Sequence, residues 1–352
     1  MKILIIKFRN IGDVLLSTPL ISNLKAHFPQ SCIDFATNFE CAPVIKKNPK
    51  IDNLILFNRD KIKKLNFFYR LKEELNLLLT IRKKKYDLVI NLTEGERGAI
   101  YAIFSGAEKR MGLKLKNNLY NNFKIYTDCL NEDYSIHALE KDLRFLQHLN
   151  KKTISYDLEF FWGKSTEKSL VKKYNYLFSK KFVVIHPVSR WMFKCWDDKK
   201  MAEVIDYIKF NKGLEVVITS SGNENEKQRV KKITSLTKSK PIDLSGLLSI
   251  EELAILISKA KLFFGIDSAP MHIAAACKVP IVCLFGASYP LIWGPWHDNQ
   301  KFGNIDGIQY NGKHYVISNM DHEIFYKDGI KSSRGMLKIE FSKVVEVLDK
   351  SI

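Results

Sequence analysis

A glycine–aspartate pair near the start of the sequence, Gly12-Asp13, is the first place where residue types and spacing could do chemistry. It follows a short apolar run at 3–6, so it lies where a buried strand gives way to a helix. Asp13 could cap that helix, because a carboxylate accepts hydrogen bonds from the free N–H groups of the first turn. It could also act as a general base toward a substrate hydroxyl, since a helix N-terminus keeps a carboxylate ionised. The residues alone leave both roles open.

A second group of polar side chains follows the apolar run at 182–185. Ser189, Arg190 and Lys194 bring one hydroxyl and two cations to the end of this expected strand. Cationic and hydroxyl donors in one loop are suited to the oxygens of a diphosphate. The loop therefore predicts one wall of an anion site.

A third group follows the apolar run at 262–266. Asp267 and Ser268 end the expected strand, and the small residues at 274–276 indicate a tightly packed helix. A strand, a short polar turn and a helix N-terminus together form an anion site from backbone N–H groups. The turn consists of Ala269, Pro270 and Met271, and His272 would lie in the first turn of the helix, where it could face the same site or be purely structural.

Two further loops carry weaker signals. Glu224 and Glu226 follow the expected strand at 215–219 and could receive sugar hydroxyls, although solvated loop acids are the commoner case. The glycine- and proline-rich loop at 285–296 follows the expected strand at 281–285. This loop would form another wall of the site.

Short apolar runs alternate with longer amphipathic segments, and this pattern sets the architecture that must position these loops. Strands that are apolar throughout are buried on both faces, which is typical of parallel sheets covered by helices. The pattern predicts an α/β fold with two Rossmann-like, doubly wound domains, in which ligands bind at the carboxyl ends of the strands. The expected elements are strands at 3–6, 86–92, 182–185, 215–219, 262–266 and 281–285, a helix over about 14–28 and a closing helix over 337–348.

The length of 352 residues suits two domains. We expect a first domain at 1–160, a second at 161–330, and a closing helix within 331–352 that could return to pack on the first domain. The chain carries 56 Lys and Arg against 38 Asp and Glu, a net charge of +18. Such an excess indicates a nucleic acid, an anionic membrane face or a phosphorylated substrate as partner.

Other features narrow the class of protein. No apolar stretch approaches the length of a membrane-spanning helix, and the run at 3–6 is too short for a signal-peptide core. The six cysteines show no metal-ligand spacing, which favours reduced thiols in a cytoplasmic protein. No acidic metal cluster is evident, so we predict chemistry that is independent of metal. No nucleic-acid-binding motif accompanies the positive charge, so nucleic acid is not an expected partner.

The motifs in this order resemble the ADP-heptose:lipopolysaccharide heptosyltransferases, family 9 of the GT-B glycosyltransferases. The resemblance rests on Gly-Asp-Val-Leu-Leu-Ser-Thr-Pro at 12–19, on His-Pro at 186–187 with Lys194-x-Trp196, and on Asp-Ser-Ala-Pro-Met-His at 267–272 with Leu-Phe-Gly at 284–286. Smaller matches at 88–112 and 137–149 extend it over nearly the whole chain. The segments at 190–197 and 267–270 look most like the branch that adds the third heptose of the inner core.

The resemblance implies a role for each group of residues. Asp13 would be the catalytic base and Lys194 would contact the donor diphosphate. The residues implied in donor binding are Ser189, Arg190, Lys194, Asp267, Ser268, Ala269, Pro270, Met271 and His272, with either Glu224 or Glu226. The chain departs from many relatives at Ser268-Ala269, where they have Thr-Gly, and at Val188, where they often have Gly.

The segment at 59–85 gives the basic excess a target. It carries ten Lys or Arg against three acids and includes aromatic residues at 67–69. It is either a solvated helix or an acceptor-side surface that meets a phosphorylated oligosaccharide and an anionic membrane leaflet. The residues expected on the acceptor side are Gly12, Lys63, Lys64, Arg70 and Glu94.

The implied activity is transfer of heptose from ADP-heptose to a heptose of the lipopolysaccharide inner core, with inversion and with no cofactor besides the donor. The protein would work at the cytoplasmic face of the inner membrane. Three alternatives remain at this point: a transferase with a protein or another glycan as acceptor, a GT-B nucleotide-sugar epimerase, and a basic nucleic-acid-binding protein.

Overall fold

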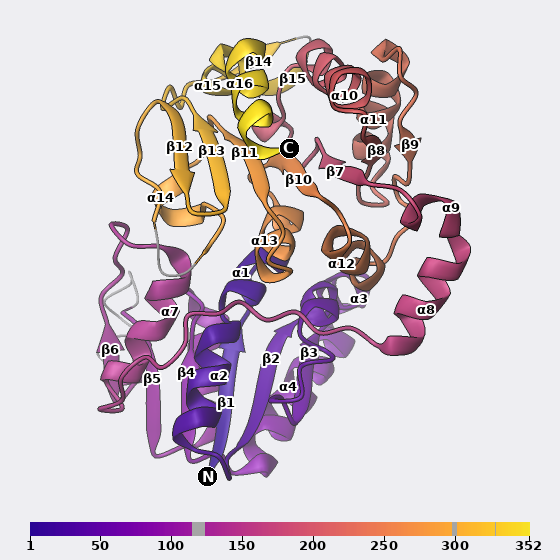
Figure 1. Cartoon of the computed structure of the whole chain (residues 1–352). Coiled ribbons are helices and arrows are strands. Elements are labelled where there is room, and N and C mark those ends of the chain that lie inside the picture. Colours follow the sequence, from indigo (N-terminus) through magenta and orange to yellow (C-terminus); the bar gives the residue numbers. More distant parts are fainter. Residues whose placement is uncertain (115–123, 298–300, 328) are drawn as a thin grey trace. The chain divides into compact units, whose positions relative to one another are not determined.

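The chain forms two compact units, Met1–Phe161 and Trp162–Ile352, in a computed structural model drawn in Figure 1. The structure describes residues 1–114, 124–297, 301–327 and 329–352. Each unit is an α/β structure built on its own largely parallel sheet. The α/β prediction with two sheet domains is therefore confirmed.

In the described part of the N-terminal unit, a six-stranded parallel sheet has the order β3-β2-β1-β4-β5-β6. The central strand β1 is buried from Ile3 to Ile6, because sheet neighbours and helices surround that apolar run. The strands are β1 (Lys2–Lys7), β2 (Cys32–Asn38), β3 (Asn53–Phe57), β4 (Leu88–Asn91), β5 (Lys109–Leu113) and β6 (Asp128–Leu130).

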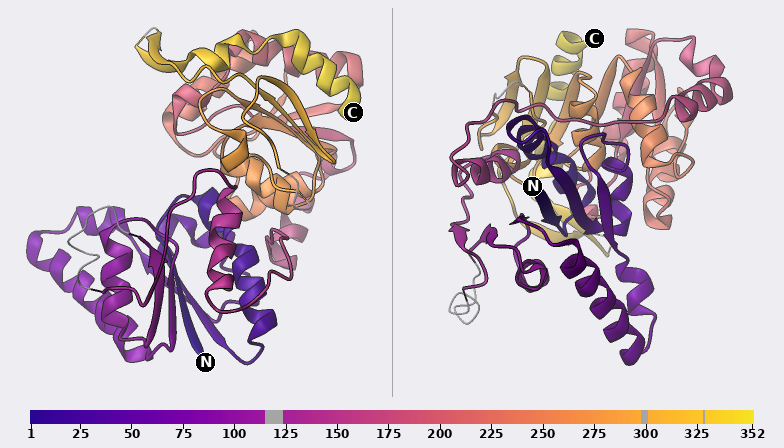
Figure 2. Two further views of the ribbon diagram at one scale, coloured as in Figure 1. Left: turned by 90° about the vertical axis from the view of Figure 1, so that its left-hand side faces the viewer. Right: turned by 90° about the horizontal axis from the view of Figure 1, so that it is seen from below.

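Helices cover both faces of this sheet (Figure 2). They are α1 (Ile11–Leu16), α2 (Thr18–His27), the 3-10 helix η1 (Phe39–Val44), α3 (Arg59–Lys63), α4 (Phe67–Lys84), α5 (Glu96–Ser105) and α7 (Ala138–Gln147). The expected single helix over 14–28 is divided at Ser17. Pro19 explains the division, because it lacks the N–H that a continuous helix would use.

In the described part of the C-terminal unit, a seven-stranded sheet has the order β12-β13-β11-β10-β7-β8-β9. Among the described strands of this sheet, only β12 runs antiparallel to its neighbour, β13, which the expectation of parallel sheets did not include. The strands are β7 (Phe182–His186), β8 (Glu215–Ile218), β9 (Ile242–Asp243), β10 (Leu262–Ile266), β11 (Ile281–Phe285), β12 (Gly307–Asn311) and β13 (His314–Ser318), with a separate pair, β14 (Ile324–Lys327) and β15 (Ile330–Ser333).

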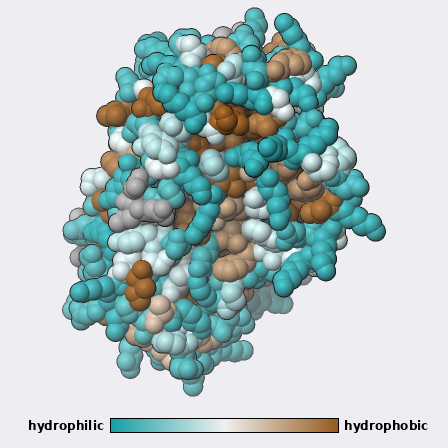
Figure 3. All heavy atoms as spheres, in the orientation of Figure 1, coloured by the Kyte–Doolittle hydropathy of each residue, from teal (hydrophilic) through white to brown (hydrophobic). Residues whose placement is uncertain are grey.

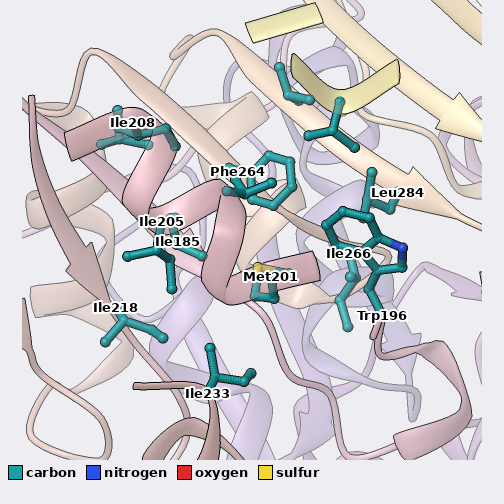
Figure 4. Packing of buried hydrophobic residues seen from close by; sticks show 14 of the residues in the cluster. Ile185, Trp196, Met201, Ile205, Ile208, Ile218, Ile233, Phe264, Ile266 and Leu284 are labelled. Atoms are coloured by element: carbon teal, nitrogen blue, oxygen red, sulfur yellow. The ribbon is translucent and has the colours of Figure 1, made fainter. Parts of the chain in front are cut away.

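The core of this unit lies between the sheet and α10, as Figure 4 shows for Phe264 and Ile266 of the sheet and Met201 and Ile205 of the helix. The helices are α8 (Lys164–Lys173), α9 (Asn175–Phe178), the 3-10 helix η2 (Met192–Lys194), α10 (Asp198–Lys212), α11 (Glu224–Leu236), α12 (Ile250–Ser258), α13 (Ala269–Ala276), α14 (Pro290–Trp293), α15 (Arg334–Lys338) and α16 (Phe341–Ser351).

The closing helix α16 belongs to the C-terminal unit, so the expectation that it packs on the first domain is wrong. Val344, Val347 and Leu348 are fully buried and join the core that contains β7, β10 and β11. The helix contacts α10, β11 and β13. Trp196 secures the preceding turn, because its indole N–H donates to the Ile339 carbonyl at 3.1 Å. The apolar face of α16 is therefore buried within its own unit.

Hydrophilic side chains cover much of the face shown in Figure 3. Within the residues that the structure describes, no helix combines the length and the apolar character that crossing a bilayer requires. All six cysteines lie among the described residues as free thiols, and Cys41, Cys195 and Cys283 are buried.

Candidate functional site

Asp13 lies at the carboxyl end of β1, in the first turn of α1. The N-cap residue is Asn10, and Asp13, at position N3 of the helix, is the second member of the capping box. Its carboxylate accepts the Asn10 backbone N–H at 3.2 Å, and the side chain is half-buried. Asp13 therefore bonds to the backbone of the N-cap residue and not, as the capping expectation had it, to the N–H groups of the first turn. The hydrogen bond also fixes the direction of this half-buried carboxylate.

A buried ion pair lies beside this turn. The Lys7 ammonium contacts both carboxylate oxygens of Asp142 at 2.8 Å, and both side chains are more than nine-tenths buried. The pKa of Asp142 is raised to about 6, mainly by burial and in smaller part by the negative charge of Asp13, while Lys7 opposes the rise. Asp13 is therefore electrostatically coupled to the pair. Sequence reasoning missed it because Asp142 lies on α7, 135 positions from Lys7.

Glu94 reaches the same edge of the sheet from the loop after β4. Arg9, in the loop before α1, forms an ion pair with Glu94 at 3.0 Å. The backbone N–H of Phe8 donates to the Thr93 hydroxyl at 2.7 Å, so the two loops are joined. The structure thus brings Glu94 to the loop that leads into Gly12 and Asp13.

The other expected acceptor residues lie at the α3–α4 turn. Lys63 and Lys64 are exposed, and Arg70 donates to the Lys63 and Leu65 carbonyls. Arg70 therefore stabilises the turn, while the two lysines present their charge to solvent. Within the described residues, Arg70 bonds to the α3–α4 turn and not to Asp13, so these cations belong to a basic surface of the same unit at that turn.

In the C-terminal unit, three strand-end loops meet at one carboxylate. The Lys194 ammonium and the Ser288 hydroxyl both donate to Oδ2 of Asp267, each at 2.5 Å. Lys194 follows β7, Asp267 follows β10 and Ser288 follows β11, which are neighbours in the sheet. The loops of Lys194 and Asp267, which were expected to line one site, therefore touch each other through these two side chains. Ser288 was not singled out, although its loop was expected to line the site.

The start of α13 lies directly beside this cluster. Ser268 is the N-cap residue, but its hydroxyl donates back to the Ile266 carbonyl at 3.2 Å instead of capping the helix. The first-turn N–H groups of a helix without a side-chain cap are suited to an anionic ligand. Ala269, Pro270 and Met271 form this first turn, and His272 follows them in a buried position.

The loop after β7 places its two other candidates differently. Ser189 is buried, and its hydroxyl accepts the Trp191 backbone N–H at 3.2 Å. Arg190 is exposed, and its guanidinium carbon lies 5.2 Å from the centre of the Trp191 ring. Ser189 thus helps to shape the loop, and Arg190 carries a charge at its surface.

The two candidate acids after β8 are clearly separated by the structure. Glu226 is buried, and its carboxylate accepts the Ser221 backbone N–H at 3.0 Å. Glu224 is exposed and pairs with Lys227 at 2.8 Å, which lowers the pKa of Glu224. Only Glu226 is therefore held toward the strand-end loop.

His186, the last residue of β7, supports the loops from below. It is buried, and its Nδ1 lies 3.0 Å from the Thr219 hydroxyl of the loop after β8. Burial lowers the pKa of His186 to about 4, so the ring is neutral near pH 7. In the part of the chain that the structure describes, His, Cys, Asp and Glu side chains form no group of three that could hold a metal ion.

Comparisons of the sequence with known proteins show the family to which the chain belongs. The profile of glycosyltransferase family 9 (heptosyltransferase) matches residues 75–314. Lipopolysaccharide heptosyltransferase 3 of Escherichia coli K12 is 34% identical over 290 residues, which are 82% of this chain and 83% of that protein. The lipopolysaccharide core heptosyltransferase OpsX of Haemophilus influenzae is 22% identical over 346 residues, covering 98% and 95% of the two chains.

Solved structures show the same fold. A glycosyl transferase of family 9 from Veillonella parvula superposes with a TM-score of 0.82 at 22% identity, covering 99% of this chain and 96% of that one. The heptosyltransferase WaaC of E. coli, solved with ADP, superposes with a TM-score of 0.76 at 16% identity over the whole of both chains.

Proposed function

This chain belongs to glycosyltransferase family 9, the heptosyltransferases, and from this premise we propose that it transfers heptose from ADP-L-glycero-D-manno-heptose to a heptose of the lipopolysaccharide inner core. The observation that carries the proposal is the cluster of Lys194, Asp267 and Ser288 beside the start of α13. This cluster supplies a cation, hydroxyls and a helix N-terminus, which are the groups that a nucleotide diphosphate needs.

On the donor side, Lys194 would exchange part of its contact with Asp267 for a phosphate oxygen. The Ser189 and Ser268 hydroxyls, Arg190, the main chain at 269–271 and His272 would complete the site. Between the two candidate acids, the inward position of Glu226 favours it over Glu224. As the glycosidic bond to ADP breaks, negative charge grows on the leaving phosphate, and Lys194 and the helix N-terminus would stabilise it.

On the acceptor side, Asp13 would accept the proton of the attacking heptose hydroxyl. The hydroxyl oxygen then forms a bond to the anomeric carbon on the face opposite the departing ADP, so the configuration inverts. The hydrogen bond from Asn10 holds the carboxylate in place, and the coupled Lys7–Asp142 pair supports the end of β1 beneath it. A proton acceptor positioned in this way contributes about 10²- to 10⁴-fold to the rate.

The proposed acceptor is acidic, so the positive charge of the chain would attract it. Lys63 and Lys64 are exposed cations suited to phosphate groups, while Gly12, Glu94 and Arg70 shape the neighbouring surface. We place the enzyme at the cytoplasmic face of the inner membrane, where its acceptor would be anchored among anionic lipids.

The test is incubation of the protein with ADP-heptose and core-truncated, heptose-bearing lipopolysaccharide, followed by mass spectrometry. We expect one added heptose, with the same yield in EDTA. Asp13→Ala should slow the reaction about 10²- to 10⁴-fold. Glu252→Ala is the matched control, because Glu252 occupies the same capping-box position in α12, and it should keep the wild-type rate.

Other outcomes point elsewhere. Binding of ADP-heptose without product indicates a protein or another glycan as acceptor, and turnover of the donor without any acceptor indicates an epimerase. Wild-type turnover by Asp13→Ala would contradict the assignment of the base.

A further inference from the structure

Helix α4 carries an apolar stripe on its solvent side. Leu71, Leu75 and Leu79 are spaced by four residues and therefore lie on one face of the helix. Their side chains are exposed by 59%, 51% and 46%, and Phe68, on the same face, by 78%. Leucines on an exposed helix face are costly in water, so a stripe of this length indicates a partner.

The stripe borders the face that attaches α4 to its own unit, but its leucines are exposed. Ile81 is fully buried, and Leu77 and Leu78 pack against the core of the N-terminal unit. The contact with the core therefore uses the adjoining side of the helix, and Leu78 lies at the boundary between the two surfaces. The stripe at 71, 75 and 79 is not needed for the core.

Helix α5 lies alongside and extends the apolar surface. Glu74 of α4 bonds to Arg97 and Tyr101 of α5, at 3.0 Å in each case, which joins the two helices. The exposed residues Ile100 and Phe104 of α5 are one helical turn apart. We call the stripe on α4 and these two residues the α4–α5 face.

Positive charge surrounds this face. The segment at 59–85 carries ten Lys or Arg, and two of its three acids are already paired, Glu73 with Lys61 and Glu74 with Arg97. A second copy of the same chain would bring an equally basic rim against this one, and the like charges would repel. Anionic phospholipid offers the complementary charge and an apolar layer behind it.

We propose that the α4–α5 face inserts into an anionic lipid bilayer, with the leucines below the phosphates and the flanking lysines and arginines against them. The inference deepens the proposed function, on which it rests for the presence of a membrane-anchored acceptor. It goes beyond attraction by charge alone, because insertion of apolar side chains resists salt.

The experiment measures sedimentation of the full chain with vesicles of phosphatidylglycerol and phosphatidylcholine, at low salt and at 0.5 M salt. We expect the wild type to remain partly bound at high salt. The variant Leu71→Gln/Leu75→Gln/Leu79→Gln should lower the partition coefficient at least tenfold at high salt and less at low salt. The control Phe210→Gln/Leu236→Gln/Leu247→Gln alters side chains of the C-terminal unit that are exposed by 62%, 43% and 58%, and it should bind as the wild type does.

Equal binding by the leucine variant and the wild type would overturn the inference, and so would a dimer that only the leucine variant disrupts. The variant should keep full turnover on a deacylated, water-soluble acceptor and lose it on an acceptor embedded in vesicles. If no acceptor supports turnover but the leucines still govern salt-resistant binding, the proposed function fails while the membrane inference stands.

Discussion

Each unit places a lysine–aspartate pair at the carboxyl end of its sheet, and the two pairs are built differently. Lys7 and Asp142 share two hydrogen bonds, and the exposed fractions of their side chains are 9% and 6%. Lys194 and Asp267 share one contact, and the Lys194 side chain is 21% exposed. Asp267 has a second donor in Ser288, whereas the ion pair of the N-terminal unit is closed to solvent.

From this difference we infer that the first pair supports the fold, whereas the second is suited to binding a ligand. In the buried pair, both carboxylate oxygens are bonded to the lysine and neither side chain is accessible to a ligand. This pair instead holds the end of β1 in place next to Asp13. A lysine that is partly exposed and singly bonded can turn toward a phosphate, while its aspartate keeps a hydroxyl partner. Burial and the number of contacts therefore make the same two residue types suited to different roles.

The largest expected effect is on stability, in Lys7→Met. The substitution leaves the Asp142 carboxylate buried without its cation, which costs about 3 to 5 kcal/mol. Hydrogen exchange in peptides of β1 and β4 measures the loss. The double variant Lys7→Met/Asp142→Leu should recover most of it, because no buried charge remains. Unchanged exchange in the single variant would mean that the pair is not a support.

Lys194→Met should instead act mainly on catalysis. Loss of a cation that stabilises the leaving group costs about 10²- to 10³-fold in kcat, and Asp267 retains Ser288, so the stability should change less than in Lys7→Met. Steady-state kinetics and a urea titration measure the two effects, with Lys194→Arg as the control that keeps the charge. A fall in stability as large as that of Lys7→Met would remove the distinction between the pairs.

The two units should also respond to acid in opposite directions. The lowered pKa of His186 means that the unfolded chain binds more protons between pH 6.5 and about 4, so acidification weakens the C-terminal unit. Between pH 7 and 5 the loss from this residue is about 2 kcal/mol. The raised pKa of Asp142 works the other way below about pH 6, because the native state then holds the extra proton.

Tryptophan fluorescence can follow the loss of stability of the C-terminal unit in acid separately from the N-terminal unit. The five tryptophans, at 162, 191, 196, 293 and 296, all lie in the C-terminal unit. Denaturant midpoints from this signal should fall between pH 7 and 5, and less in His186→Gln. A flat profile in the wild type would contradict the stated titration.

The smallest expected effect separates the two acids after β8. Glu226→Ala should weaken binding of ADP-heptose about tenfold, because the Ser221 N–H loses its acceptor and the loop shifts. Glu224→Ala should leave affinity within about twofold, since it removes only an exposed ion pair. Calorimetric titration with ADP-heptose measures both, and a reversed order would exchange their roles.

The sequence predicted most where the physics is local. The apolar runs at 3–6, 262–266 and 281–285 were expected as strands because buried parallel strands need no polar face, and each is a strand. The polar residues after these strands were also recognised, and their loops were expected to lie together because parallel strands end at one edge of a sheet. The direct contact between Lys194 and Asp267 was not predicted.

The same reasoning could not identify contacts between residues that are far apart in the sequence. Nothing around Lys7 indicates that Asp142 would enclose it, since only the packing of α7 on the sheet brings them together. The partner of α16 was misjudged for the same reason, because an amphipathic helix records that one face is buried but not which surface covers it. Which of Glu224 and Glu226 is buried depends on the residue at which α11 begins. The sequence indicated that residue only approximately.

The position of α16 has a consequence for synthesis on the ribosome. The N-terminal unit has its last long-range bonds near Glu159, where Ser22 and Lys50 meet its carboxylate. It can therefore fold while the rest of the chain is still being made. The C-terminal unit needs Val344, Val347 and Leu348 to close its core. At a synthesis rate of about 5 to 20 residues per second, roughly 10 to 40 seconds separate folding of the N-terminal unit from completion of the C-terminal core. During this time the apolar face that α16 will cover is exposed to chaperones.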